Sequence, residues 1–352
     1  MNVNNNVDSF YSTIERSNLN ERLESTQIAS LRLWNNFIKA VSLATFVNLN
    51  LPILVIDLAC GKGGDFFKLL QLFRSIQKYV GIDITRKSLE DFQNRIDSQK
   101  IPLPQNFTYK LQHLDLRFPL PTNEYDNQFT LINIGFAFHY FFETMESVHN
   151  FFQNMSRVLL EQGRVVITTP CDSTLRRRLD KSIYKTNERV ELRVVSEVNN
   201  ALLCRVVHLH RKPHAYLFEL YDAPNIPAVK AEEYFVNNDL LIELCRQYSF
   251  DVIYKESFTD FIQKHKNHSL AENMNVSGLN ISLSDASILN MYQVIVLEKQ
   301  RRIGVSQTNT IPTGIEENAF DSIDDFFTNE TTTNVVPESP PYSSTVNDDY
   351  DF

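Results

Sequence analysis

The chain has no long hydrophobic run and no paired cysteines. No apolar stretch reaches the roughly 18 residues that a membrane-spanning helix requires, so we expect no membrane span. The first 20 residues are polar and rich in asparagine, which argues against a signal peptide. The cysteines lie far apart without a Cys-x-x-Cys pair, which predicts a reduced intracellular protein without a structural zinc site; they are Cys60, Cys171, Cys204 and Cys245.

Basic residues are missing from the C-terminal end. Residues 303–352 contain ten acids and no lysine or arginine, which predicts a disordered acidic tail. The net charge of −9 therefore hides a near-neutral body, in which 34 basic residues face 33 acids. A nucleic-acid ligand would make short contacts with such a body rather than fill a long basic groove. Within the tail, Phe320 to Phe327 alternates acidic and apolar residues and is either a docking peptide or part of a solubilising tail.

Several catalytic and binding motifs are also absent. Gly-x-x-x-x-Gly-Lys-Ser/Thr does not occur, which disfavours an ATP-type phosphate loop. No Ser-His-Asp order, no glycosidase acid pair and no Lys-x-Asp-Gly nucleotidyl motif is present. His208, His210 and His214 lack an acid or cysteine at ligand spacing, so we expect no metal site.

The most informative feature present is a glycine turn at residues 57–65. A hydrophobic run precedes the turn, a helical pattern follows it, and Asp83 ends the next apolar run about 20 residues on. A carboxylate at that spacing can hold the ribose hydroxyls of a nucleotide-like ligand. Asp57, Asp65 and Asp83 would repel a pyrophosphate but attract the sulfonium and ammonium of S-adenosylmethionine. The charges therefore favour a class I methyltransferase over an NAD enzyme.

Strand and helix patterns alternate over residues 50–170, which predicts an α/β fold with a mostly parallel sheet and helices on both faces. We divide the chain into a flexible lead at 1–20, a methyltransferase domain at 21–302 with a β insertion or lid at 184–221, and the tail at 303–352. The predicted helices are Ser25–Leu43, Phe66–Leu72, Lys87–Ile96, Met145–Leu160 and Glu232–Tyr248. Asn267–Ser287 is predicted to be a loop, and the predicted strands of the main sheet are Ile53–Ile56, Tyr79–Ile82, Phe107–Leu111, Phe129–Ile134, Arg164–Thr168, Asp251–Tyr254 and Tyr292–Glu298.

Several segments together resemble the mRNA cap guanine-N7 methyltransferases. Residues 31–39, Leu-Arg-Leu-Trp-Asn-Asn-Phe-Ile-Lys, are similar to the family's Leu-Arg-x-x-Asn-Asn-x-x-Lys helix. Residues 139–144, His-Tyr-Phe-Phe-Glu-Thr, resemble its His-Tyr-x-Phe-Glu-Ser/Thr. Residues 233–236, Glu-Tyr-Phe-Val, resemble part of its Pro-Glu-Tyr-Leu-Val. Further segments that carry the resemblance are the glycine turn, Tyr79–Ile84, Asn154–Leu159 and Thr168-Thr169-Pro170, so it spans about residues 25–300.

The resemblance implies S-adenosylmethionine as cofactor and assigns residues to it. Lys39 would reach the methionine carboxylate, Asp65 the ammonium, and Asp83 the ribose. Asp115 would accept from the adenine amino group or cap a helix. The remaining cofactor residues are Ala59, Gly61, Gly135 and Tyr140. Ala59 stands where the family has glycine, which is tolerable at negative φ, and Gly135 stands where it often has glutamine, so an adenine-side contact is lost or comes from the backbone.

The resemblance also implies a 5′-capped RNA substrate. Asn35, His139, Pro170, Glu233 and Tyr292 would bind the cap guanine, although Glu232 leaves the register of the glutamate open. Guanine N7 needs no general base, so we expect positioning by His139, Tyr140 and Glu233 rather than proton transfer.

Other interpretations stay open. Arg176-Arg177-Arg178 would meet the cap triphosphate or RNA backbone, or form a solvated basic face. The acidic tail would serve a capping-enzyme or polymerase partner. A cellular protein would lie in the nucleus, and a viral one in the host cytoplasm or virion. The alternatives are a class I methyltransferase of another substrate and a catalytically idle subunit of a capping complex.

Overall fold

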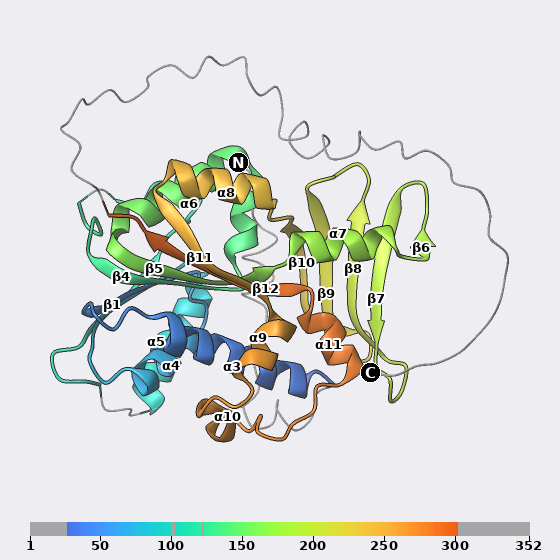
Figure 1. The fold of residues 1–352 in the computed structure, drawn as a ribbon, viewed down its shortest axis with the longest axis horizontal. Coiled ribbons are helices and arrows are strands. Elements are labelled where there is room, and N and C mark those ends of the chain that lie inside the picture. The colour runs from blue at the N-terminus through green and yellow to red at the C-terminus, as the bar shows by residue number, and fades with distance from the viewer. Residues whose placement is uncertain (1–26, 100–102, 122, 302–352) are drawn as a thin grey trace, which may run out of the picture.

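The computed structural model describes residues 27–99, 103–121 and 123–301, which form two sheets (Figure 1). The larger sheet has seven strands in the order β11-β12-β5-β4-β1-β2-β3. Strands β1 to β5 pair in parallel, whereas β12 runs antiparallel to both β5 and β11. The bounds are β1 Ile53–Leu58, β2 Ile76–Asp83, β3 Thr108–His113, β4 Phe129–Gly135, β5 Leu159–Pro170, β11 Phe250–Ser257 and β12 Tyr292–Lys299.

Helices cover both faces of the larger sheet (Figure 1). On one face lie α3 Ala29–Phe46, α4 Gly64–Leu72 and α5 Arg86–Gln99, and on the other lie α6 Met145–Val158 and α8 Asn238–Gln247. Two apolar cores follow from this arrangement, one around Phe37, Phe66 and Phe92 and one around Phe151 and Leu241. The predicted α/β fold is therefore confirmed, and the carboxyl ends of the parallel strands meet at one edge, where such sheets bind ligands.

The second sheet is antiparallel and lies beside the first (Figure 1). Its strands lie in the order β10-β9-β8-β7-β6. Helix α7, Asp172–Asp180, packs on it through buried Leu175 and Leu179. The strands are β6 Tyr184–Lys185, β7 Arg189–Val195, β8 Leu202–Leu209, β9 Ala215–Ala223 and β10 Ile226–Tyr234. The sheet thus continues to Tyr234, past the boundary predicted at residue 221.

Two predicted segments differ from the structure. The helix predicted from Glu232 begins only at Asn238, because residues 232–234 pair with β9 and the side chain of Asn237 caps the helix. The loop predicted at 267–287 contains α10, Leu270–Asn273, and the start of α11, Leu283–Leu289, which Ser282 caps. A polar capping side chain sets the start of α8 and of α11, and strand pairing occupies the residues just before α8. The local sequence pattern revealed neither effect.

Smaller differences concern element ends. Helix α3 begins at Ala29 and α6 ends at Val158, because Leu159 already belongs to β5. The remaining helices are the 3₁₀ helix η1, Phe138–Glu143, and α9, Phe258–His265. The predicted cap at Ser25 or Thr26, the lead at 1–20 and the tail with Phe320 to Phe327 lie outside the described residues. Across the described ranges, no helix combines the length and apolarity that a bilayer crossing needs.

Candidate functional site

The glycine turn joins β1 to α4 at the carboxyl edge of the larger sheet. Ala59, Gly61 and Gly63 all have positive φ, at 59°, 53° and 73°. The condition under which alanine would be tolerable at position 59, a negative φ, is therefore not met, and Ala59 is held in a left-handed conformation that costs strain. Glycine is required at position 63, because a Cβ there would lie 2.2 Å from the buried ring of Phe92.

Asp83 closes this turn from the neighbouring strand. Its Oδ2 accepts from the backbone N–H of Gly61 at 2.7 Å, and its Oδ1 accepts from that of Thr85 at 2.8 Å. The carboxylate is buried and held in one orientation by these two donors. A carboxylate has about four acceptor sites, so a group held in this way can also accept from ribose hydroxyls.

Lys39 and Asp65 form an ion pair beside the turn. Nζ of Lys39 lies 2.8 Å from Oδ1 of Asp65, and Lys68 reaches the same oxygen at 2.9 Å. Burial alone would raise the pKa of Asp65, but the two lysines outweigh it and hold that pKa below its usual range. A lysine and a carboxylate side by side are complementary to the carboxylate and ammonium of an amino acid, which is the methionine end of the expected cofactor.

Gly135 belongs to this charged end of the site. A Cβ at that position would lie 3.0 Å from Oδ2 of Asp65 and 3.5 Å from Cδ of Lys39. A side chain there would thus point at the ion pair, and whether an adenine-side contact is lost or comes from the backbone of Gly135 stays open. Because Gly135 has no side chain, there is space at the end of β4 for the ion pair of Lys39 and Asp65.

Asp57 lies beneath the pair as a second, fully buried carboxyl group. It accepts from the Tyr79 hydroxyl at 2.6 Å and from Nδ2 of Asn133 at 2.8 Å, and Asn133 also reaches Asp65 at 3.3 Å. Burial, with repulsion from Asp65, raises the pKa of Asp57 to about 7. Sequence analysis missed Asn133 and Tyr79, although a polar residue within the apolar run of β4 was a usable signal.

Asp115 is engaged elsewhere. It follows β3 and accepts from the side-chain Nε of Arg117 at 2.9 Å and from the Arg117 backbone N–H at 3.1 Å. No helix of the described chain begins at Asp115, so the helix-cap alternative is not realised. An adenine amino group would share this carboxylate with Arg117.

His139 and Glu233 face each other across the two sheets. His139 comes from η1 and Glu233 from β10, yet Nε2 of His139 lies 3.4 Å from Oε1 of Glu233. Both side chains are buried, and neither ring nitrogen of His139 has a hydrogen-bond partner among the described residues. A buried polar ring without partners calls for an explanation, and a ligand that is held here would supply one.

Other side chains define the register and the walls of this region. The hydroxyl of Tyr216 donates to Oε2 of Glu233 at 2.9 Å, whereas exposed Glu232 pairs with Lys212 at 2.7 Å. Of the two glutamates, therefore, only Glu233 faces His139. The ring of Tyr140 lies 4.2 Å from that of His139. Sequence analysis missed Tyr216, since nothing in the local β pattern marks it.

Pro170 and Tyr292 are cross-strand neighbours on β5 and β12. The Tyr292 ring is stacked on Phe258, with centroids 5.6 Å apart, and Phe136 meets it edge-on at 5.5 Å. Phe136 itself has a φ of +59°, an uncommon conformation for a bulky residue, at the end of β4. Phe136, Tyr292 and Phe258 thus form an aromatic cluster. It contacts Lys39 at one end, where Nζ lies 5.8 Å from the Phe136 centroid, and the second sheet at the other, where Phe218 lies 6.2 Å from Tyr292.

Asn35 and the histidines complete the comparison with the predicted residues. Oδ1 of Asn35, on α3, is buried without a hydrogen-bond partner in the described part of the chain. His208 and His210 lie with ring centroids 6.2 Å apart. Across residues 27–99, 103–121 and 123–301, no three His, Cys, Asp or Glu side chains are grouped to hold a metal ion.

The fold and the glycine turn with its facing Asp83 define a Rossmann-like methyltransferase fold. The structure of the CcbJ methyltransferase from Streptomyces caelestis resembles this one with a TM-score of 0.50. The match covers 76% of this chain and 95% of that chain at 11% sequence identity, and at this identity the likeness shows the fold alone.

The chain belongs to the mRNA (guanine-N(7))-methyltransferase domain family, whose model matches residues 1–309, as the sequence motifs had suggested. An mRNA cap guanine-N(7) methyltransferase of Debaryomyces hansenii is 26% identical over 309 residues, covering 74% of this chain and 56% of that protein. One of Drosophila melanogaster is 25% identical over 284 residues, covering 76% and 64%. A Cryptococcus neoformans relative is covered over only 38% of its length, so the match spans about half or less of several relatives.

Proposed function

We propose that this chain transfers a methyl group from S-adenosylmethionine to guanine N7 of a 5′ GpppN RNA cap. The observation that carries the proposal is the buried pair of His139 and Glu233 at the junction of the two sheets, in which neither imidazole nitrogen makes a hydrogen bond to any described residue. A guanine offers its N1 and N2 hydrogens to a carboxylate such as Glu233, whose second oxygen is already fixed by Tyr216.

The proposed cofactor site lies at the sheet edge. Lys39 and Asp65 bind the amino-acid end, Gly61 allows close approach of the backbone, and Asp83 binds the ribose. The role of Asp115 at the adenine stays a prediction. S-adenosylmethionine would supply an electrophilic methyl group, so an unprotonated guanine N7 needs no general base.

The chain's own contribution is then positioning and electrostatics. Methylation makes the guanine cationic, and the carboxylate of Glu233 favours that charge from the Watson–Crick edge. Tyr292 would add an aromatic face beside the guanine. Pro170, its cross-strand neighbour, would pack on the base as well. His139 and Tyr140 orient the base, with the adjacent aromatic rings excluding water. His139 is thus a binding residue in this proposal and transfers no proton.

The test is transfer of labelled methyl from S-adenosylmethionine to GpppA- and GpppG-capped RNA. Transfer to N7 that vanishes in Asp83→Ala supports the proposal. No transfer with retained cofactor binding would point to another methyl acceptor or a missing partner. Loss of both would favour an idle methyltransferase-fold subunit. An intracellular location follows from the proposal, whereas a capping-enzyme or polymerase partner for the acidic tail stays a prediction.

A further inference from the structure

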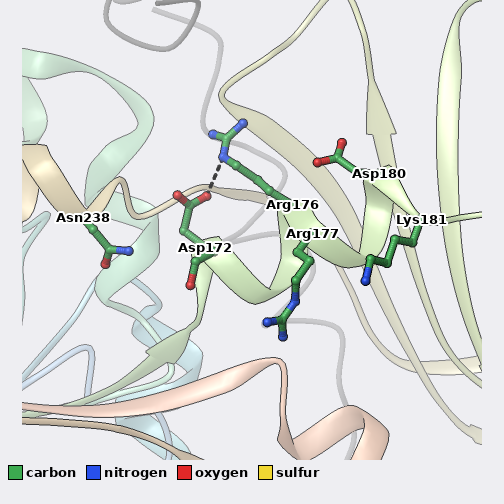
Figure 2. A pocket seen from close by; sticks show the side chains of 7 residues that line it. Asp172, Arg176, Arg177, Asp180, Lys181 and Asn238 are labelled. Carbon is green, nitrogen blue, oxygen red and sulfur yellow. Dashed lines mark hydrogen bonds and ion pairs between the residues drawn. The ribbon is translucent and has the colours of Figure 1, made fainter. Parts of the chain in front are cut away.

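A cleft of about 410 Å³ lies along α7, outside the site described above (Figure 2). Most of its lining comes from that helix, and Asn238 of α8 closes one end. The lining side chains are charged or polar throughout: Asp172, Ser173, Arg176, Arg177, Asp180, Lys181 and Asn238. The cleft therefore fits a small charged group better than an apolar ligand.

Two cations in the cleft are available to a ligand. Arg177 and Lys181 are four residues apart, so they project from the same side of the chain, as Figure 2 shows. Both are exposed, and neither side chain has an ion pair or hydrogen bond with any described residue. Two unpaired cations side by side repel each other, and an anion between them relieves that repulsion.

A third cation is held in place. Nε of Arg176 donates to Asp172 at 2.8 Å, and its guanidinium lies 4.0 Å from the centroid of Phe235. This pairing neutralises Asp172 and leaves the outer guanidinium nitrogens as donors in a fixed plane. Three cations against two acids give the lining a net positive charge, with Ser173 and Asn238 as neutral hydrogen-bonding groups.

The cleft adjoins the proposed guanine site through one chain of contacts. Phe235, beneath Arg176, packs on Tyr216 with ring centroids 4.8 Å apart, and Tyr216 donates to Glu233. Helix α7 also begins two residues after Pro170. A ligand that occupies both places would be continuous, and a capped RNA carries phosphates beyond its guanine.

We infer that this cleft binds a backbone phosphate of the RNA chain of the capped substrate, through Arg177 and Lys181, whereas the Arg176 head group points to the other side of α7 (Figure 2). The inference rests on the proposed function, since that function supplies the RNA. It gives a role to two exposed cations that lie on the helix following Pro170. Phosphate contacts of this kind position the RNA and carry no sequence preference.

The test compares two methyl acceptors in the full-length chain, GpppA alone and a GpppA-capped oligoribonucleotide. The variant Arg177→Ala/Lys181→Ala removes both exposed cations. A control of equal charge change, Lys110→Ala/Lys230→Ala, removes two exposed lysines elsewhere, each of which is paired with a glutamate. We expect the first variant to raise KM for the capped RNA about 10-fold and to lower the salt dependence of RNA binding by about 1.4 in log–log slope. KM for GpppA should not change.

Binding of uncapped RNA, followed by fluorescence anisotropy, gives a readout that does not need methyl transfer. Weaker binding in the first variant alone supports the cleft even if the proposed reaction fails. The inference would be overturned if millimolar inorganic phosphate displaced the RNA and RNA affinity did not depend on RNA length, because the cleft would then be a site for free phosphate. Equal changes for GpppA and capped RNA, no change in either, or the same loss in the control would also overturn it.

Discussion

His139 and Glu233 lie 94 residues apart in the chain, yet Nε2 of the one is 3.4 Å from Oε1 of the other. His139 lies in the 3₁₀ helix η1, which follows β4 of the larger sheet, and Glu233 lies in β10 of the antiparallel sheet. The candidate guanine site is therefore a product of how the two sheets meet.

Glu233→Gln removes the charge at this junction and keeps the shape of the side chain. We expect kcat/KM for capped RNA to fall about 10- to 100-fold, because a hydrogen bond to a charged group contributes about 1.5–3 kcal/mol. Affinity for S-adenosylmethionine should stay unchanged. Glu232→Gln is the matched control, since that carboxylate is exposed and paired with Lys212. An equal loss in both variants would contradict the assignment of Glu233.

Lys39→Met removes the cation expected to meet the cofactor carboxylate. We expect the Kd for S-adenosylmethionine to rise about 10-fold or more, since a charge-assisted contact is lost. Lys68→Met is a close control, because Lys68 pairs with the same oxygen of Asp65 and the charge balance there changes equally. Isothermal titration calorimetry measures both. If Lys68→Met raised the Kd more than Lys39→Met, the carboxylate contact would belong to Lys68, and the assignment to Lys39 would be wrong.

Gly63→Ala and Gly61→Ala separate steric from conformational strain in the turn. Both glycines have positive φ, but a Cβ at 63 meets the Phe92 ring whereas one at 61 meets no heavy atom within 4 Å. We expect Gly61→Ala to lower the free energy of unfolding by about 1–2 kcal/mol and Gly63→Ala by about 3 kcal/mol or more. Denaturant unfolding of both variants checks this order. Equal losses would mean that the turn relaxes around the added methyl.

Asp57 predicts a pH dependence of stability. Its pKa is raised from 3.8 to about 7 in the folded chain, so between these values the folded state holds a proton that the unfolded state has lost. Stability should therefore fall as pH rises from about 4 to 7, and this contribution should level off above that range. The lowered pKa of Asp65 acts below pH 4 and does not interfere.

Asp57→Asn tests this directly, because an amide does not titrate. The difference in unfolding free energy between the original chain and the variant should change with pH across this window. A constant difference would show that the carboxyl of Asp57 ionises at its ordinary pKa.

The amino-acid sequence by itself determined the α/β class, the strand ends and the glycine turn. These depend on local signals: apolar runs of strand length, the glycines at 61 and 63, and a carboxylate at the end of the next strand. The motif containing Lys39 and the one containing His139 were also visible, because each lies within one short segment. In the structure Lys39 lies beside Asp65, and His139 lies in η1, just past β4.

Only the tertiary structure decided what lies opposite these residues. The antiparallel register of β9 and β10 turns Glu233 rather than Glu232 towards His139 and brings Tyr216 to its carboxylate. A shift of one residue would exchange the two faces of the strand, and no local pattern excludes it. The same holds for the positive φ of Ala59 and for the approach of Lys39 to Asp65, because packing between distant segments imposes both.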